Sequence, residues 1–326
     1  MSDTGLHTRI DFAADADPVN GVVRWSAMKS IWWTGMLLGW VVGGAIWFSW
    51  SAVCVFIVSC AVTLCLGHSI GMHRKLIHEA FDCPLWLERV FVYLGTLVGL
   101  QGPFGMMVMH DMRDWAQRQS ACHAFLSHQS GILRDFWWQL HCKLDLDAPP
   151  AYRVPDRIAQ DRFYQVLQST WMAQQVPLAM VLFAFGGIGW VAWGICGRVA
   201  VSVFGHWLIG YFAHNDGPDK SRRDWHIRGA SVQGYNVRGF GLLTFGECWH
   251  NNHHAFPGSA RLGHDGQMDP GWWVLCAFAR VGLITRLNQP SDLPERAELE
   301  PITHDSDQTR PFDLGSPRSD TLPSIR

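Results

Sequence analysis

Histidine is the residue type whose number and spacing point most directly to chemistry in this chain. The sequence holds 16 histidines, and one short run brings together His250, His253 and His254. In a helix these are positions i, i+3 and i+4, so their imidazoles share one face. Neutral imidazole is a good ligand for iron, copper, nickel and zinc. The run therefore predicts part of a metal site.

Other histidines are needed for this site, because one helical turn supplies only two or three ligands. His73 and His78 form a second cluster, and His110 and His214 follow uncharged segments. A basic membrane-surface patch is the alternative for the His73 cluster, and a simple interfacial role is the alternative for His214. The nine cysteines include no Cys-x-x-Cys pair, which disfavours a structural zinc finger or an iron–sulfur cluster.

Two long apolar segments predict the elements that carry the histidines. Residues 31–67 contain no Asp, Glu, Lys or Arg, and Arg198 is the one such residue in 163–215. A membrane helix needs about 20 apolar residues, so each segment predicts a hairpin of two spans. The expected spans cover residues 31–49, 51–67, 168–186 and 190–213. Arg198 is expected near the outer end of the last span, where its side chain can reach the interface.

A third uncharged stretch, residues 90–109, has glycines and a proline in its middle, which suit a straight helix poorly. We interpret it as a re-entrant or interfacial segment. The alternative is a fifth full span, which would put His110 on the opposite side of the membrane from His73 and His78.

Charge placement predicts which side of the membrane holds the site. Two hairpins put residues 1–30, 68–162 and 214–326 on one side, and nearly all lysines and arginines fall there, which indicates the cytoplasm. We expect an integral protein of a bacterial inner membrane with cytoplasmic termini. The net charge of -2 offers no basic field for nucleic acid. The expected parts are an N-terminal cytosolic segment, 1–30, a membrane domain, 31–285, and a disordered tail, 288–326.

The histidine clusters and their neighbours resemble the histidine boxes of the membrane fatty acid desaturases, particularly the acyl-CoA Δ9 (stearoyl-CoA) type. His73-Arg-Lys-Leu-Ile-His78 resembles the first box, H-R-x-x-x-H. Residues 246–257 resemble the third box, G-E-x-x-H-N-x-H-H-x-F-P. His214 resembles the extra histidine that ends the last span, and Gln101-Gly102-Pro103 resembles the approach to the second box. The likeness covers about residues 30–285.

This resemblance implies an all-α integral membrane fold, with four transmembrane helices in two hairpins and a cytosolic helical cap that holds the metal site. It implies two irons, O2 activation and removal of two hydrogens from the acyl chain of an acyl-CoA or a membrane lipid. Electrons would come from a separate ferredoxin or cytochrome b5 type protein. The implied metal ligands are His73, His78, His110, His214, His250, His253 and His254.

The second box departs from the family pattern H-x-x-H-H, because Arg113 and Asp114 replace two of its imidazoles. Asp114 can ligate a metal through oxygen. Arg113 cannot, since it stays protonated and has no acceptor, and its charge would oppose a nearby cation unless it pairs with Asp111 or Asp114. The usual asparagine four residues before the extra histidine is Gly210. Unassigned histidines that could fill the gap are His68, His123, His128, His141 and His206.

The leading hypothesis is thus an acyl-chain desaturase with a histidine-rich di-iron site, in which Glu247 and Asp114 are candidates for orienting the imidazoles. Two alternatives remain open. One is a hydroxylase of alkyl or lipid chains, because the two reactions share the first hydrogen abstraction. The other is a non-catalytic membrane scaffold that has lost one metal, which the altered second box favours.

Overall fold

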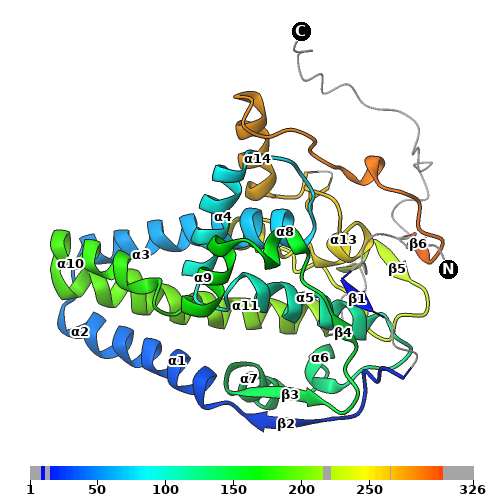
Figure 1. Cartoon of the computed structure of the whole chain (residues 1–326), viewed down its shortest axis with the longest axis horizontal. Coiled ribbons are helices and arrows are strands. Elements are labelled where there is room, and N and C mark those ends of the chain that lie inside the picture. The colour runs from blue at the N-terminus through cyan, green and yellow to red at the C-terminus, as the bar shows by residue number, and fades with distance from the viewer. Residues whose placement is uncertain (1–8, 12–14, 216–221, 265, 304–326) are drawn as a thin grey trace.

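The computed structural model describes residues 9–11, 15–215, 222–264 and 266–303 of a mostly helical chain. Long helices lie side by side and extend toward one end of the molecule. Shorter helices and the small strands gather at the other end (Figure 1). We call the end that holds the shorter helices and the small strands the cap.

The first long hairpin lies close to the predicted apolar segment. Helix α1, Ala27–Leu38, continues through a π-helical stretch, Gly39–Gly43, into α2, Gly44–Ile46. The chain turns before Ser49, whose hydroxyl accepts from the Ala52 amide and caps α3, Trp50–Val62. Helix α3 runs on directly as a long π-helix, η2, Thr63–Ile77.

The second hairpin turns at Gly187, whose φ of 65° lies in the region that favours glycine. The turn lies inside the range of helix α10, Gln175–Val191, most of which precedes Gly187. After it, η3, Ala192–Gly197, leads into α11, Arg198–His214. The expected span from residue 168 begins later, because α9, Arg162–Thr170, is a separate amphipathic helix. In the described part of the chain, two continuous helical segments are long and apolar enough to cross a membrane, Trp50–Ile77 and Gln175–His214.

Arg198 does not reach an interface, and that expectation is wrong. The side chain is 0% exposed, and its Nε donates to the Gly194 carbonyl at 2.9 Å. The guanidinium also donates to the Leu97 carbonyl and to Gln175 Oε1. Leu97 ends α4, where helix carbonyls lack partners and the helix dipole favours a cation. The buried charge therefore ties α4 to the second hairpin.

The glycine-rich stretch at residues 90–109 forms two helices with a break between them. Helix α4, Leu85–Leu97, ends before Gly99, which has a φ of 83°, and α5 begins at Pro103 and ends at Gln117. The backbone N–H at the first helical position has no acceptor within the helix. Proline lacks this N–H, so no helical hydrogen bond is lost there. The break redirects the chain so that α5 passes the end of η2.

Close packing between α4 and η2 requires glycine. A Cβ on Gly67 would lie 2.4 Å from the Gly95 amide nitrogen, and one on Gly71 would lie 2.5 Å from the Phe91 carbonyl oxygen. Since η2 leads directly to His73 and His78, these glycines set the distance between that helix and its neighbour.

The chain is mostly helical, as expected, but the cap also contains small sheets, which the expectation of a helical cap did not include. Its short helices are α6, Ala124–Ser127, α7, Ile132–His141, α8, Asp156–Ala159, α12, Gly241–Thr244, α13, His250–Ala255, and α14, Pro270–Arg280. Three antiparallel two-stranded sheets lie in the described part of the chain: β1, Ile10–Asp11, with β4, Ala151–Tyr152; β2, Gly21–Trp25, with β3, Cys142–Leu146; and β5, Trp225–Ile227, with β6, Leu299–Pro301. Each joins segments far apart in sequence, so local pattern gives little sign of them.

The start of the expected disordered tail is ordered, which is a second correction. After a 3-10 turn, Pro290–Asp292, the chain reaches β6. Arg296 donates to the carbonyls of His254 and Ala255 at 2.9 and 2.8 Å. These bonds satisfy orphan carbonyls at the end of α13. The rest of the predicted tail, residues 304–326, lies outside the described residues.

Gly71→Ala tests the close packing of η2 on α4. We expect it to lower the free energy of unfolding by about 1–3 kcal/mol, because the added methyl meets backbone rather than a movable side chain. Thermal unfolding in detergent, followed by tryptophan fluorescence, measures the effect. Gly35→Ala in α1 is the matched control, since nothing lies within 4 Å of its Cβ position. Equal stability of the two variants would contradict the packing argument.

Candidate metal centre

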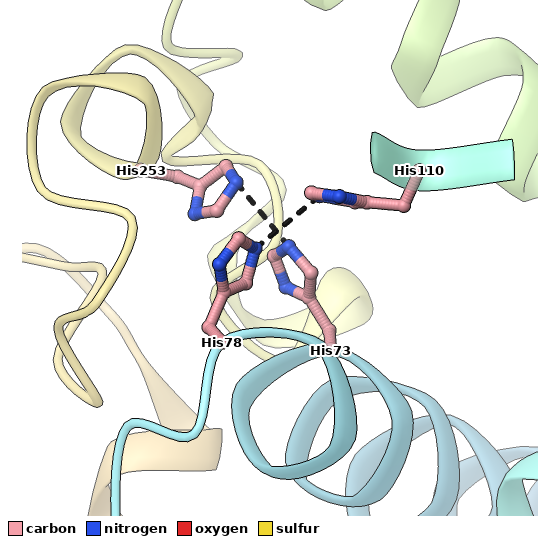
Figure 2. Close-up of side chains that lie close together, drawn as sticks. All are labelled: His73, His78, His110 and His253. Carbon is pink, nitrogen blue, oxygen red and sulfur yellow. Dashed lines mark hydrogen bonds between the residues drawn. The ribbon is translucent and has the colours of Figure 1, made fainter. Parts of the chain in front are cut away.

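The structure gathers the seven predicted histidines into two groups. The first group holds His73, His78, His110 and His253, and the second holds His214, His250 and His254. Within each group the ligand atoms lie within 4.8 Å of one another. Figure 2 shows the four imidazoles of the first group pointing toward a common centre.

Nitrogen atoms that are far apart in sequence approach closely in both groups. In the first group, Nε2 of His73 lies 3.3 Å from Nε2 of His253, and Nε2 of His78 lies 3.3 Å from Nε2 of His110 (Figure 2). In the second, Nε2 of His250 lies 3.1 Å from that of His214 and 2.9 Å from that of His254. Such convergence of Nε2 atoms is the arrangement that a metal ion requires.

The π-helical form of η2 aligns His73 with His78. In an α-helix, residues five apart differ by about 140° around the axis, so the two rings would diverge. The His78 amide instead donates to the His73 carbonyl at 3.1 Å, the i to i+5 bond of a π-helix. The wider turn brings both imidazoles to one side. The five-residue spacing of the first histidine box thus has a backbone explanation.

One short helix, α13, joins the two groups. His250 and His254 are four residues apart and face the second group, whereas His253 faces the first. His110 comes from the middle of α5, and His214 is the last residue of α11. Because α13 contributes to both, the groups are adjacent, as a two-metal centre requires.

Outer contacts fix the orientation of the imidazoles in the first group. Nδ1 of His73 lies 2.6 Å from Glu247 Oε2, and Ser69 donates to the other oxygen of that carboxylate at 2.6 Å. Nδ1 of His110 lies 3.3 Å from Asp111 Oδ1. A carboxylate on Nδ1 leaves Nε2 free to bind a metal and makes it more basic. Glu247 therefore lies where the sequence analysis expected an orienting group.

Asp111 is a supporting residue that the sequence analysis did not assign. Besides His110, it receives hydrogen bonds from Arg9 at 2.7 and 3.1 Å and from the Tyr152 hydroxyl at 2.8 Å. These partners belong to the N-terminal segment and to β4. Adjacency to His110 was the only local signal, because its partners are distant in sequence.

The second group has different outer contacts. Nδ1 of His214 donates to the Gly210 carbonyl at 2.8 Å, which again directs Nε2 inward. Nδ1 of His254 lies 3.6 Å from Asp114 Oδ1, and Asp114 also pairs with Arg118 at 3.2 Å. Asp114 is in neither ligand group, and its position beside Nδ1 suits an orienting role rather than a ligand role.

Burial favours the neutral form, which ligation needs, in the three imidazoles of α13. Desolvation lowers the pKa of His250, His253 and His254 well below the usual value, and neighbouring imidazoles add to the effect. Glu247 stays ionised: burial opposes its charge, but contacts with His73 and Arg74 hold the pKa of that carboxyl below its usual range. Seven imidazole nitrogens in two adjacent groups fit two transition-metal ions.

Arg113 does not pair with Asp111 or Asp114, so the pairing that would offset its charge is not formed. Its guanidinium contacts Nε2 of His128, and Nη2 donates to Gln139 Oε1 at 2.9 Å. The reason is that Asp111 already binds Arg9, and Asp114 binds Arg118.

The unassigned histidines join neither group. His128 stacks on His214 with ring centres 5.5 Å apart, and His68 packs against His206 at 5.1 Å. His123 accepts from the Phe125 amide and caps α6, while His141 contacts the Ser30 hydroxyl. Of these, only His128 touches a member of the ligand set through its ring.

Comparison with known proteins now identifies the family. The model of the fatty acid desaturase family matches residues 48–263. The chain is 32% identical over 261 residues to a protein named sn-1 stearoyl-lipid 9-desaturase from Synechocystis sp., covering 75% of this chain and 74% of the relative. An acyl-CoA 5-desaturase from Anemone leveillei is 30% identical (76% and 75% covered), and Delta-9 acyl-lipid desaturase 2 from Arabidopsis thaliana is 30% identical (77% and 79% covered).

The chain belongs to the fatty acid desaturase family. It is therefore a membrane-associated oxidoreductase of lipid metabolism, and the recognition from the histidine boxes is confirmed. The named relatives include both acyl-lipid and acyl-CoA desaturases.

Glu247→Gln tests the support of the first group. Loss of the carboxylate beside His73 Nδ1 should weaken metal retention about 10–100-fold, as is typical when such an outer partner is removed. Metal per protein, measured after dialysis against a weak chelator, reports the change. Glu300→Gln is the control, because Glu300 is 48% exposed in β6. Unaltered metal content in the Glu247 variant would contradict the assigned role.

Proposed function

We propose that this protein is a fatty acyl desaturase that uses O2 and two histidine-bound irons to introduce a double bond into an acyl chain. The observation that carries the proposal is the convergence of seven imidazoles, from four separate segments, on two adjacent points. The proposed ligands are the four histidines of the first group for one iron and the three of the second group for the other. Family membership supports the same reaction class.

The reaction removes one hydrogen from each of two neighbouring methylene groups. The balanced change is –CH2–CH2– plus O2, two electrons and two protons, giving –CH=CH– and two waters. The irons, when bound, supply the oxidising chemistry with O2. The electrons require a donor, for which we propose a separate protein of ferredoxin or cytochrome b5 type.

The protein's own residues hold the donor atoms in place and keep water away. Glu247 and Asp111 fix the ring orientation of His73 and His110, so that little reorganisation is needed when metal binds. His253 is 3% exposed and His254 is 5% exposed. A water-poor site strengthens each electrostatic contact and protects a reactive oxidant from side reactions.

For the membrane arrangement we propose four spans in two hairpins: the helices from Ala27 to Ile46, from Trp50 to Ile77 and the two arms of Gln175–His214. All seven histidines lie at or beyond the same ends of these helices, which supports a single metal site on one side. Basic residues of the cap favour the cytoplasm of a bacterial inner membrane. The segment α4–α5 then enters and leaves on the same side.

The substrate is proposed to be an acyl-CoA or a membrane lipid. Relatives named for both carriers are similar to this chain to nearly the same degree, at 32% and 30% identity. Both carriers present the same apolar methylene chain to the metal site.

A second candidate is a non-catalytic scaffold with an incomplete metal centre. The specific observation in its favour is the second group, which has three imidazoles, with Arg113 and Asp114 in place of two box histidines. Metal analysis in the presence of excess iron discriminates: two bound irons favour catalysis, and one bound iron or none under the same conditions favours the scaffold.

His253→Ala tests the function. Expression of the wild-type gene in a bacterial host should produce new unsaturated acyl chains, and the variant should produce none, because the first group loses a ligand. Gas chromatography with mass spectrometry of total fatty acids measures both. His226→Ala is the control, since His226 lies in β5 outside both groups.

The outcomes separate the candidates. New hydroxylated chains instead of double bonds would establish a hydroxylase. Unchanged products in the His253 variant, with equal protein in the membrane fraction, would remove the metal centre from the reaction.

A further inference from the structure

Two departures from the family pattern, Arg113 and Gly210, meet in space at one imidazole. A Cβ on Gly210 would lie 3.2 Å from Nε2 of His128, so glycine leaves the room that this ring occupies. Arg113 contacts the same nitrogen from α5. The ring of His128 also stacks on that of His214, with an interplanar angle of 15°. His128 thus fills space beside the second group.

His128 is held firmly in this place. Its backbone has a φ of 56°, a conformation uncommon for non-glycine residues, and its carbonyl accepts from Asn215 at 2.9 Å. Nδ1 lies 2.8 Å from Oδ2 of Asp135, which is 0% exposed and also accepts from Trp207 at 2.8 Å. With Nδ1 donating to this carboxylate, Nε2 of His128 is the acceptor for Arg113.

This network fixes a positive charge next to the second group. Arg113 stays protonated, and its contacts with His128 and Gln139 hold the guanidinium in position. The His128 ring that it contacts stacks on the ring of His214, with ring centres 5.5 Å apart. The compensating carboxylate, Asp135, lies on the far side of the His128 ring.

The other carboxylates near the two histidine groups each lie beside an arginine of their own. Asp111 pairs with Arg9, Glu247 lies 3.8 Å from Arg74, and Asp114 pairs with Arg118. Each orienting carboxylate therefore has an arginine partner. Arg113 differs because the His128 ring separates it from its counter-charge, Asp135, and it stands beside the group that has three imidazoles rather than four.

We propose that the two metal positions differ in affinity, with the four-histidine group tight and the three-histidine group weak and exchangeable, because Arg113 keeps a positive charge beside the latter. The inference rests on the metal centre of the proposed function. Fewer donors and a neighbouring cation both disfavour a divalent ion at the second position. The protein then holds one metal firmly and gains its second only when metal is plentiful.

Titration of the metal-free, detergent-solubilised protein with Co²⁺, followed by visible absorbance, tests the proposal without any measurement of activity. We expect two binding steps that differ by about tenfold or more in affinity. His78→Ala should remove the tight step, and His214→Ala should remove the weak one. These two variants assign the steps to the groups.

Two variants that each remove one charge should change the metal affinity of the weak step in opposite directions. Arg113→Gln should strengthen it about tenfold, because the amide keeps a hydrogen-bond donor near His128 without the charge. Asp135→Asn should weaken it by a similar factor, because the charge of Arg113 is no longer offset. Neither should move the tight step, which serves as an internal control for folding. Arg153→Gln is the surface control, since Arg153 is 77% exposed.

Equal affinity of the two steps, or a weak step that Arg113→Gln leaves unchanged or weakens further, would overturn this inference alone. Failure of the wild type and of Arg113→Gln to bind any metal would overturn it together with the proposed function.

Discussion

The close approach of imidazole nitrogens is the constraint on which the rest of this structure depends. Nε2 atoms of residues as distant as His73 and His253 lie 3.3 Å apart. A metal ion needs several neutral donors at one point, and no single helix supplies them. The first apolar hairpin, the broken α4–α5 segment, the second hairpin and α13 must therefore all end at the same place.

Buried charges and close backbone contacts maintain that arrangement. Arg198 joins α4 to the second hairpin through the Leu97 carbonyl, and Gly67 and Gly71 let η2 pack directly on α4. Beyond the helices, Arg9 reaches Asp111 behind His110, and Arg296 holds the end of α13. Both chain ends of the described structure thus contribute to the support of the two histidine groups.

Much of the fold was predictable because its signals are local. Long uncharged runs predict the hairpins, and the turns fall near Ser49 and Gly187, close to the expected positions. The three small sheets and the ordered chain at residues 288–303 were missed, since their pairing depends on distant partners. Arg198 was misplaced for the same reason, because two of its three acceptors come from α4 and α10.

The sequence by itself determined the family and the set of seven histidines, because box spacing and flanking residues are local patterns. Only the tertiary structure decided how these histidines divide into groups of four and three, since that depends on which helices meet. It also decided the place of Arg113, whose partners His128 and Gln139 lie on other elements. Side-chain type limits what a residue can bind, whereas packing determines which partner it reaches.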